Sequence, residues 1–195
     1  MRALLAAAAL GLASMPATAQ DTSFEFDTKV IQLPEGARPH DAAPGPAGQI
    51  WYTAQRQGAL GIVDIASWTY RQVPLGEGSA PHGVVQGPDG MAWITGWNSG
   101  KLYRYRPSDQ SWKTFALPGE KPQAYAVYVD ERDDVWVTDF ASNNTLVFDI
   151  ATETWIATIP GSGPNAGVRQ ILGRGNEIYL PESGTNRLML VTVGG

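Results

Sequence analysis

After residue 20 the chain is a succession of short segments in which apolar and polar positions alternate, separated by turns rich in glycine, proline and asparagine. Strict alternation over about four to eight residues is typical of a β-strand with one buried face. No run in this part of the sequence has the helical apolar period of about 3.6 residues. The pattern therefore predicts an all-β fold.

One of these segments repeats along the chain. Residues 50–53 read Ile-Trp-Tyr-Thr, and the pattern returns at 92–95, at 135–138 and more weakly at 178–181. Trp51, Trp93, Trp136 and Tyr179 are spaced by 42, 43 and 43 positions. Tight turns precede the copies at 45–48, 87–90, 130–133 and 173–176. A second tryptophan follows at 68, 112 and 155. Extended segments that end near proline lie at 30–34, 71–74, 114–118 and 157–160. Four landmarks in one phase indicate a structural repeat.

Each repeat contains four predicted strands. The first leads into the tight turn, the second carries the Trp-x-Thr motif, the third lies at 60–65, 102–106, 146–150 or 188–193, and the last follows the second tryptophan. Four strands in about 42 residues match one blade of a β-propeller, whereas a solenoid needs a shorter unit or helices. We expect Trp51, Trp93 and Trp136 to pack between neighbouring blades.

The fold prediction is an all-β propeller of four-stranded blades, with four repeats at approximately 30–70, 71–112, 113–155 and 156–195. If residues 30–34 supply the outer strand of the last blade, the four blades close into a ring. The alternative is a partial propeller, an arc with two bare blade faces. Such apolar faces favour self-association, so an arc predicts contacts between chains.

Residues 1–19 are predicted to be a signal peptide. Met1 and Arg2 supply a positive start, residues 3–13 form an apolar core, and residues 17–19 read Ala-Thr-Ala, a pattern that signal peptidase accepts. The core is too short to span a bilayer, and the alternative is an ordinary buried N-terminal helix. We expect one propeller domain at 20–195, in the periplasm or secreted, with no membrane span after cleavage.

Composition excludes several kinds of function. The net charge is −5 with both signs scattered along the sequence, which argues against a nucleic-acid partner. The chain contains no cysteine, so disulfides and thiolate metal sites are excluded.

The two histidines of the chain, His40 and His82, are the candidate catalytic residues. They lie 42 positions apart, each follows a proline, and each begins a predicted innermost strand. The repeat therefore places them side by side at the mouth of the central channel. A neutral imidazole there is suited to proton abstraction near neutral pH. The alternative is a structural role, because duplication alone would copy a harmless Pro-His pair.

The other two repeats carry Tyr125 and Val168 at the histidine position, with Arg169 beside the latter. The residue after each motif threonine, or its equivalent, is Ala54, Gly96, Asp139 or Glu182. The two repeats that carry histidine therefore have no acidic residue at this position, whereas the other two repeats do. In a closed ring, His82 would neighbour Asp139 and His40 would neighbour Glu182, which predicts histidine–carboxylate pairs between blades. The alternative is that both acids are solvated rim groups.

The repeat resembles the unit of the virginiamycin B lyase (streptogramin lyase) family. That unit combines Pro-His, Gly-Pro-Asp-Gly and Leu-Trp-Phe-Thr-Glu, and residues 81–95 are the nearest copy, with Pro-His, Gly-Pro-Asp-Gly and Ala-Trp-Ile-Thr. The resemblance covers residues 30–193. It implies a seven-bladed propeller, about three blades more than this sequence holds. A truncated member, a gene fragment and an assembly of two chains are the alternatives that this difference leaves.

The resemblance implies a metal-assisted carbon–oxygen lyase that opens a cyclic ester or lactone by elimination, with Mg²⁺ as the cofactor. The family draws its base from a Pro-His dipeptide, which corresponds here to His40 and His82. Substrate contacts are then expected from rim residues: Trp97, Tyr125, Asp139, Arg169 and Glu182. Because positions 54 and 96 lack the glutamate of the family motif, the alternative is a non-catalytic periplasmic propeller that binds a small molecule, a cyclic peptide or a protein.

Overall fold

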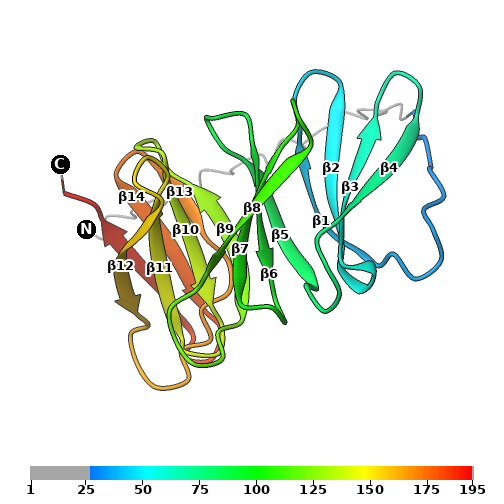
Figure 1. Ribbon diagram of the computed structural model, residues 1–195. Helices are drawn as coiled ribbons and strands as arrows, with labels where there is room; N and C mark the ends of the chain where they lie inside the picture. Colours follow the sequence, from blue (N-terminus) through cyan, green and yellow to red (C-terminus); the bar gives the residue numbers. More distant parts are fainter. Residues whose placement is uncertain (1–26, 195) are drawn as a thin grey trace, which may run out of the picture. The chain divides into compact units, whose positions relative to one another are not determined.

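The computed structural model describes residues 27–194, so the predicted signal peptide at 1–19 lies outside the described residues. The chain divides into two units, Met1–Val30 and Ile31–Gly195. All strands described below belong to the second unit (Figure 1). No helix among residues 27–194 is long and apolar enough to cross a membrane.

The second unit consists of antiparallel sheets whose strands follow chain order, and each sheet is called a blade here. Blade 1 contains β1 (Pro39–Pro44), β2 (Gln49–Ala54), β3 (Ala59–Asp64) and β4 (Thr69–Pro74). Blade 2 contains β5 (Pro81–Gln86), β6 (Ala92–Gly96), β7 (Lys101–Arg106) and β8 (Ser111–Ala116). Blade 3 contains β9 (Ala124–Val129), β10 (Asp134–Asp139), β11 (Asn144–Asp149) and β12 (Thr154–Pro160). Blade 4 contains β13 (Leu172–Arg174), β14 (Glu177–Glu182) and β15 (Arg187–Thr192).

The all-β prediction is confirmed, and the one helical element in the described part is the 3₁₀ turn η1 (Gln55–Gln57). Blades 1 to 3 have the expected four strands, whereas blade 4 has three. The sheets are out of phase with the sequence repeats, because the segment that opens a repeat, such as residues 71–74, is the outer strand of the preceding blade.

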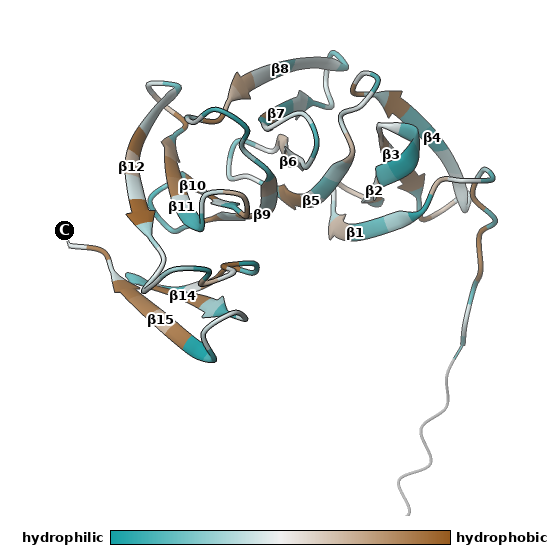
Figure 2. Ribbon diagram, turned by 90° about the horizontal axis from the view of Figure 1, so that it is seen from below, coloured by the Kyte–Doolittle hydropathy of each residue, from teal (hydrophilic) through white to brown (hydrophobic). Residues whose placement is uncertain are grey.

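Residues 30–34 do not form the fourth strand of blade 4 in this structure. They have no strand conformation, and Ile31 and Leu33 pack against the cluster of Tyr52, Ala54 and Val63 on blade 1. The innermost strands β1, β5 and β9 lie side by side, and the blades follow one another along an arc with blades 1 and 4 at its ends (Figure 2). On blade 4, Leu188 and Leu190 of β15 are 66% and 50% exposed. Self-association through this blade remains a prediction.

The tryptophans of the repeated motif fill the space between blades. Trp51 belongs to a buried cluster with Ile94 and Tyr105 of blade 2, and Trp93 to a cluster with Val137 and Phe148 of blade 3. Trp136 lies in a third cluster together with residues of blade 4, among them Ile178 and Leu180. All three indole rings are almost completely buried. The prediction that they pack between blades is confirmed.

The motif threonines connect each blade to the next. Thr53 accepts a hydrogen bond from the backbone N–H of Asp41 (3.0 Å) and donates to the carbonyl of His82 in the next blade (2.9 Å). Thr95 repeats this with Gly83 (2.8 Å) and Tyr125 (2.6 Å). The third copy is Thr138, which joins Ala126 to Arg169. Each hydroxyl thus fixes the backbone near the start of the next blade, at the second residue of β5 and of β9 and at Arg169, three residues before β13.

Replacing Thr95 with valine is expected to destabilise the protein by about 2 kcal/mol, because the isosteric side chain leaves the buried N–H of Gly83 and the partly buried carbonyl of Tyr125 without this partner. Urea unfolding followed by fluorescence measures the shift of the midpoint. Thr145→Val is the matched control, since within residues 27–194 the buried Thr145 hydroxyl has no hydrogen-bond partner. Equal losses in the two variants would contradict the bridging role.

Candidate functional site

His40 and His82 lie next to each other at the rim of the unit. They occupy the second position of β1 and of β5, the innermost strands of adjacent blades. The centroids of the two imidazole rings are 3.8 Å apart and the ring planes are tilted by 43°. The side-by-side placement that the 42-residue spacing predicted is confirmed.

The carboxylate nearest to this pair is Asp41, which the sequence analysis missed. Nδ1 of His40 lies 2.9 Å from Oδ1 of Asp41, and both side chains are about one-third exposed. Because a carboxylate only accepts, the ring carries its proton on Nδ1, and the lone pair of the neutral imidazole lies on Nε2. The repeat predicts a carboxylate at the position that follows the motif threonine. Asp41 instead directly follows the histidine, in Pro-His-Asp, where blade 2 has Pro-His-Gly.

His82 is the buried member of the pair, with only 4% of its surface exposed. Its ring is enclosed by His40 on one side and by Tyr125 on the other, with a centroid distance of 3.9 Å to Tyr125. Burial, followed by the charge of His40, lowers the pKa of His82 to about 4, against the smaller opposing effects of Asp41 and the Tyr125 backbone. His82 is therefore a neutral imidazole at neutral pH.

Three of the rim residues expected to contact a ligand, Trp97, Tyr125 and Arg169, extend this stack. The ring of Trp97 lies 5.4 Å from Tyr125 and 5.5 Å from Phe140. The guanidinium carbon of Arg169 lies 5.0 Å from the Phe140 ring centre, a cation–π contact. The structure thus brings Trp97, Tyr125 and Arg169 together with the histidines, and Phe140 joins them.

Asp139 and Glu182 are both buried, so the alternative that they are solvated rim acids is wrong. Asp139 is 2% exposed and accepts hydrogen bonds from the N–H of Gln123 (2.7 Å) and the hydroxyl of Ser142 (2.5 Å). Glu182 is 1% exposed and accepts from the N–H and hydroxyl of Ser162.

The expected pairing of these acids with histidines across blades is not observed either. Among the described residues, no hydrogen bond joins Asp139 to His82 or Glu182 to His40. Burial raises the pKa of Glu182, but the hydrogen bonds from Ser162 and Thr185 outweigh it, so the net shift is downward. Both carboxylates stabilise turns at the ends of their own blades, and a contact with a ligand remains a prediction for them.

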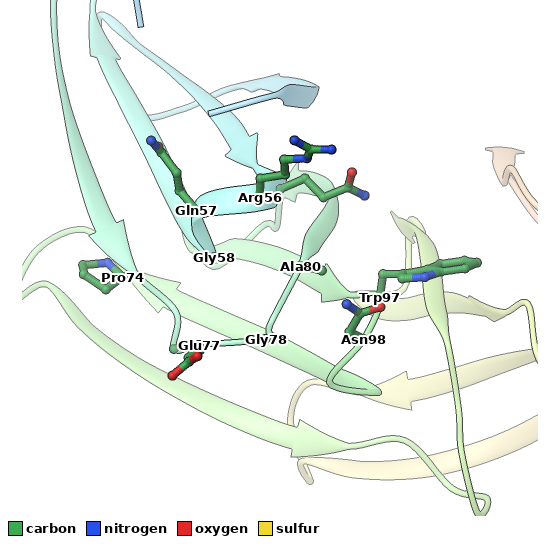
Figure 3. A pocket seen from close by; sticks show the side chains of 11 residues that line it. Arg56, Gln57, Gly58, Pro74, Glu77, Gly78, Ala80, Trp97 and Asn98 are labelled. Atoms are coloured by element: carbon green, nitrogen blue, oxygen red, sulfur yellow. The ribbon is translucent and has the colours of Figure 1, made fainter. Parts of the chain in front are cut away.

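A cavity of about 640 Å³ opens beside the histidine pair, between η1 and blade 2 (Figure 3). Arg56 and Gln57 lie on its η1 side, and Glu77, Trp97 and Asn98 lie on the opposite side. Trp97 also lies 5.9 Å from the ring of His82, so it is a neighbour of both the cavity and the histidine pair. A cavity of several hundred Å³ is large enough for a drug-sized ligand.

No family model and no curated protein matches the chain. Two crystal structures of virginiamycin B lyase from Staphylococcus aureus are similar to it, one selenomethionine-substituted and one a catalytically inactive variant with quinupristin. They are 20% and 22% identical, with TM-scores of 0.76, and each match covers 83% of this chain and 54% of the lyase. A streptogramin B lyase structure has a TM-score of 0.71 at 15% identity, over 84% of this chain and 57% of the other.

A third similar protein is the extracellular domain of a putative one-component system from B. thetaiotaomicron. Its TM-score is 0.65 at 14% identity, and the match covers 79% of this chain and 20% of that one. At such identities the similarity shows the fold alone. The unit has a propeller fold. The chain spans about half the length of the lyases that it resembles.

The residues at the propeller mouth do not suit the expected Mg²⁺. Mg²⁺ prefers six oxygen ligands in near-ideal octahedral geometry, usually several of them water. The one cluster of potential ligands found among the described residues, His40, Asp41 and His82, offers two imidazole nitrogens and one carboxylate oxygen. No step proposed below therefore uses Mg²⁺.

Proposed function

We propose that the propeller mouth around His40 opens a cyclic ester by elimination, as a carbon–oxygen lyase. The observation that carries the proposal is the 2.9 Å contact between His40 Nδ1 and Asp41 Oδ1 at a partly exposed rim position. A base that a third group orients is the usual arrangement for proton abstraction. Asp41 fixes the ring and leaves Nε2 to act on a ligand.

In the proposed reaction, Nε2 of His40 takes a proton from the carbon next to a carbonyl. The electron pair of that C–H bond forms a carbon–carbon double bond, and the ester C–O bond on the adjacent carbon breaks. The ester oxygen leaves as part of a carboxylate, so no water is consumed. Asp41 stabilises the imidazolium of His40, and His82, which is neutral, adds no positive charge beside it.

The aromatic rim supports this proposal because it gives the ligand a surface next to the base. Trp97 and Tyr125 offer ring faces and edges, and Arg169 offers a cation beside Phe140. The cavity beside Trp97 has room for a part of the ligand that does not react. Structural similarity to a lyase solved with quinupristin adds support, and quinupristin is therefore the compound to test first.

We expect the protein to convert quinupristin to a linear product, and His40→Asn to lower the turnover rate at least about a hundredfold, the usual contribution of a general base. Mass spectrometry distinguishes the chemistry, because elimination leaves the mass unchanged whereas hydrolysis adds one water. Arg106→Gln, at an exposed ion pair in blade 2, is the matched control.

Asp41→Asn leaves the His40 imidazole in place but removes the negative charge that stabilises its protonated form. We therefore expect kcat to fall while KM stays the same. A linear product formed equally fast by His40→Asn would contradict the proposal, and so would a product that has gained water.

A second candidate is a propeller that binds such a ligand without converting it. One feature of the sequence favours it, because Ala54 and Gly96 occupy the position at which the motif of the resembled lyase family has glutamate. Quenching of tryptophan fluorescence by quinupristin with no linear product after prolonged incubation would establish this alternative. We also infer that either function operates in the periplasm or outside the cell, on the basis of the signal-like sequence at 1–19.

A further inference from the structure

The rim cluster of His40, Asp41 and His82 has the ligand set of a metal site. One donor atom from each residue lies within 4.8 Å of the others. Two imidazole nitrogens and one carboxylate oxygen suit Zn²⁺, Ni²⁺ or Cu²⁺, which favour nitrogen more than Mg²⁺ or Ca²⁺ do. The ligand set thus differs in kind from one that would select Mg²⁺.

A second observation points to a ligand at the same place. Nδ1 of His82 is buried, and within residues 27–194 it has no hydrogen-bond partner. The His82 side chain is enclosed by the rings of His40, Tyr125 and Trp97, and only 4% of the residue is exposed. Buried polar atoms in native proteins almost always have a partner. A buried imidazole that has one unpaired nitrogen and packs against a second imidazole, itself next to a carboxylate, is an arrangement that a cation would complete.

We propose that His40, Asp41 and His82 together bind one divalent cation of the Zn²⁺ or Ni²⁺ class at the propeller mouth. Zinc bonds to imidazole nitrogen and to carboxylate oxygen are about 2.0–2.2 Å long, so the donors must approach one another by side-chain rotation. His40 and Asp41 are about one-third exposed and have room to rotate, whereas His82 is held by its neighbours. Three protein ligands leave a fourth position for water or for a ligand.

The proposal has a consequence that rests on the function proposed above. A cation on His40 either takes the lone pair of Nε2 or displaces the Nδ1 proton that Asp41 holds. In both cases His40 can no longer act as a base. The cation therefore inhibits the elimination, and a chelator restores it.

Equilibrium dialysis of the untagged, EDTA-treated protein against Zn²⁺, with metal analysis of the protein fraction, tests the binding directly. We expect one Zn²⁺ per chain, retained in a large excess of Mg²⁺. His40→Gln and Asp41→Asn change partly exposed side chains and should fold normally, and each should weaken Zn²⁺ binding at least about tenfold. Asp109→Asn, an exposed aspartate in blade 2, is the matched control and should bind as the parent does.

Three results would overturn the metal site: no bound Zn²⁺, displacement of Zn²⁺ by Mg²⁺, or unchanged affinity in both His40→Gln and Asp41→Asn. Dialysis needs no substrate, so it separates this proposal from the proposed function. Zinc binding that depends on His40, with no turnover of quinupristin before or after chelation, removes only the lyase. Turnover that Zn²⁺ does not affect, in a protein that binds none, removes only the metal site.

Discussion

Replacing Trp93 with alanine is expected to destabilise the protein by about 3–5 kcal/mol, the usual cost of removing a buried tryptophan. Trp93 is fully buried between blades 2 and 3. Its ring centroid lies 5.8 Å from Phe148 and 6.1 Å from Phe115, and the guanidinium carbon of Arg104 lies 5.5 Å from it. The substitution therefore opens a cavity at the interface of two blades, where neither sheet can move without disturbing the other.

This loss is a large fraction of the stability of a typical domain, which is about 5–15 kcal/mol. Trp112→Ala is the control, since Trp112 belongs to the second repeated tryptophan position and is 45% exposed. Urea unfolding of both variants should give a much lower midpoint for Trp93→Ala and a small shift for Trp112→Ala. Similar shifts would mean that the repeated motif does not hold the blades together.

The fold and the histidine pair were predictable because a repeat carries three-dimensional information. When each unit forms the same blade, positions one period apart occupy equivalent places on neighbouring blades. This argument placed Trp51, Trp93 and Trp136 between blades and placed His40 beside His82, as the structure confirms.

The carboxylates were harder to place, because their roles depend on partners that the period does not encode. Asp130 begins the tight turn predicted at 130–133, yet it is 6% exposed and accepts a hydrogen bond from the indole nitrogen of Trp136 (2.9 Å). Blades 1 and 2 have Gly45 and Gly87 at this position, where a Cβ would collide with the tryptophan ring. Asp41 was missed for a similar reason, since it departs from the repeat and has no equivalent in blade 2.

The number of strands in blade 4 could not be predicted from the sequence repeat alone. Residues 30–34 match the outer strands in sequence, but pairing with β15 would require blades 1 and 4 to meet. Instead Ile31 and Leu33 lie on the free face of blade 1, in the cluster that includes Tyr52. The motif itself weakens at this end, because Pro181 replaces the threonine that would bond to a following blade.

The metal-free protein is expected to lose stability as the pH falls from about 6.5 to about 4, because of His82. Its pKa is about 4 in the folded protein, mainly through burial and then the charge of His40, against about 6.5 in an unfolded chain. In this range His82 is protonated in the unfolded state but not in the folded state, so stability rises with pH. The contribution is complete above pH 6.5 and amounts to about 3 kcal/mol over the whole range.

Urea unfolding in EDTA at a series of pH values measures this dependence, and His82→Gln isolates it. The carboxylates of the protein also take up protons near pH 4, but they do so in both proteins, so the difference between the two curves reports His82. The parent should lose stability faster than His82→Gln on acidification. Parallel curves would show that His82 has the same pKa in the folded and unfolded states, and would contradict this prediction.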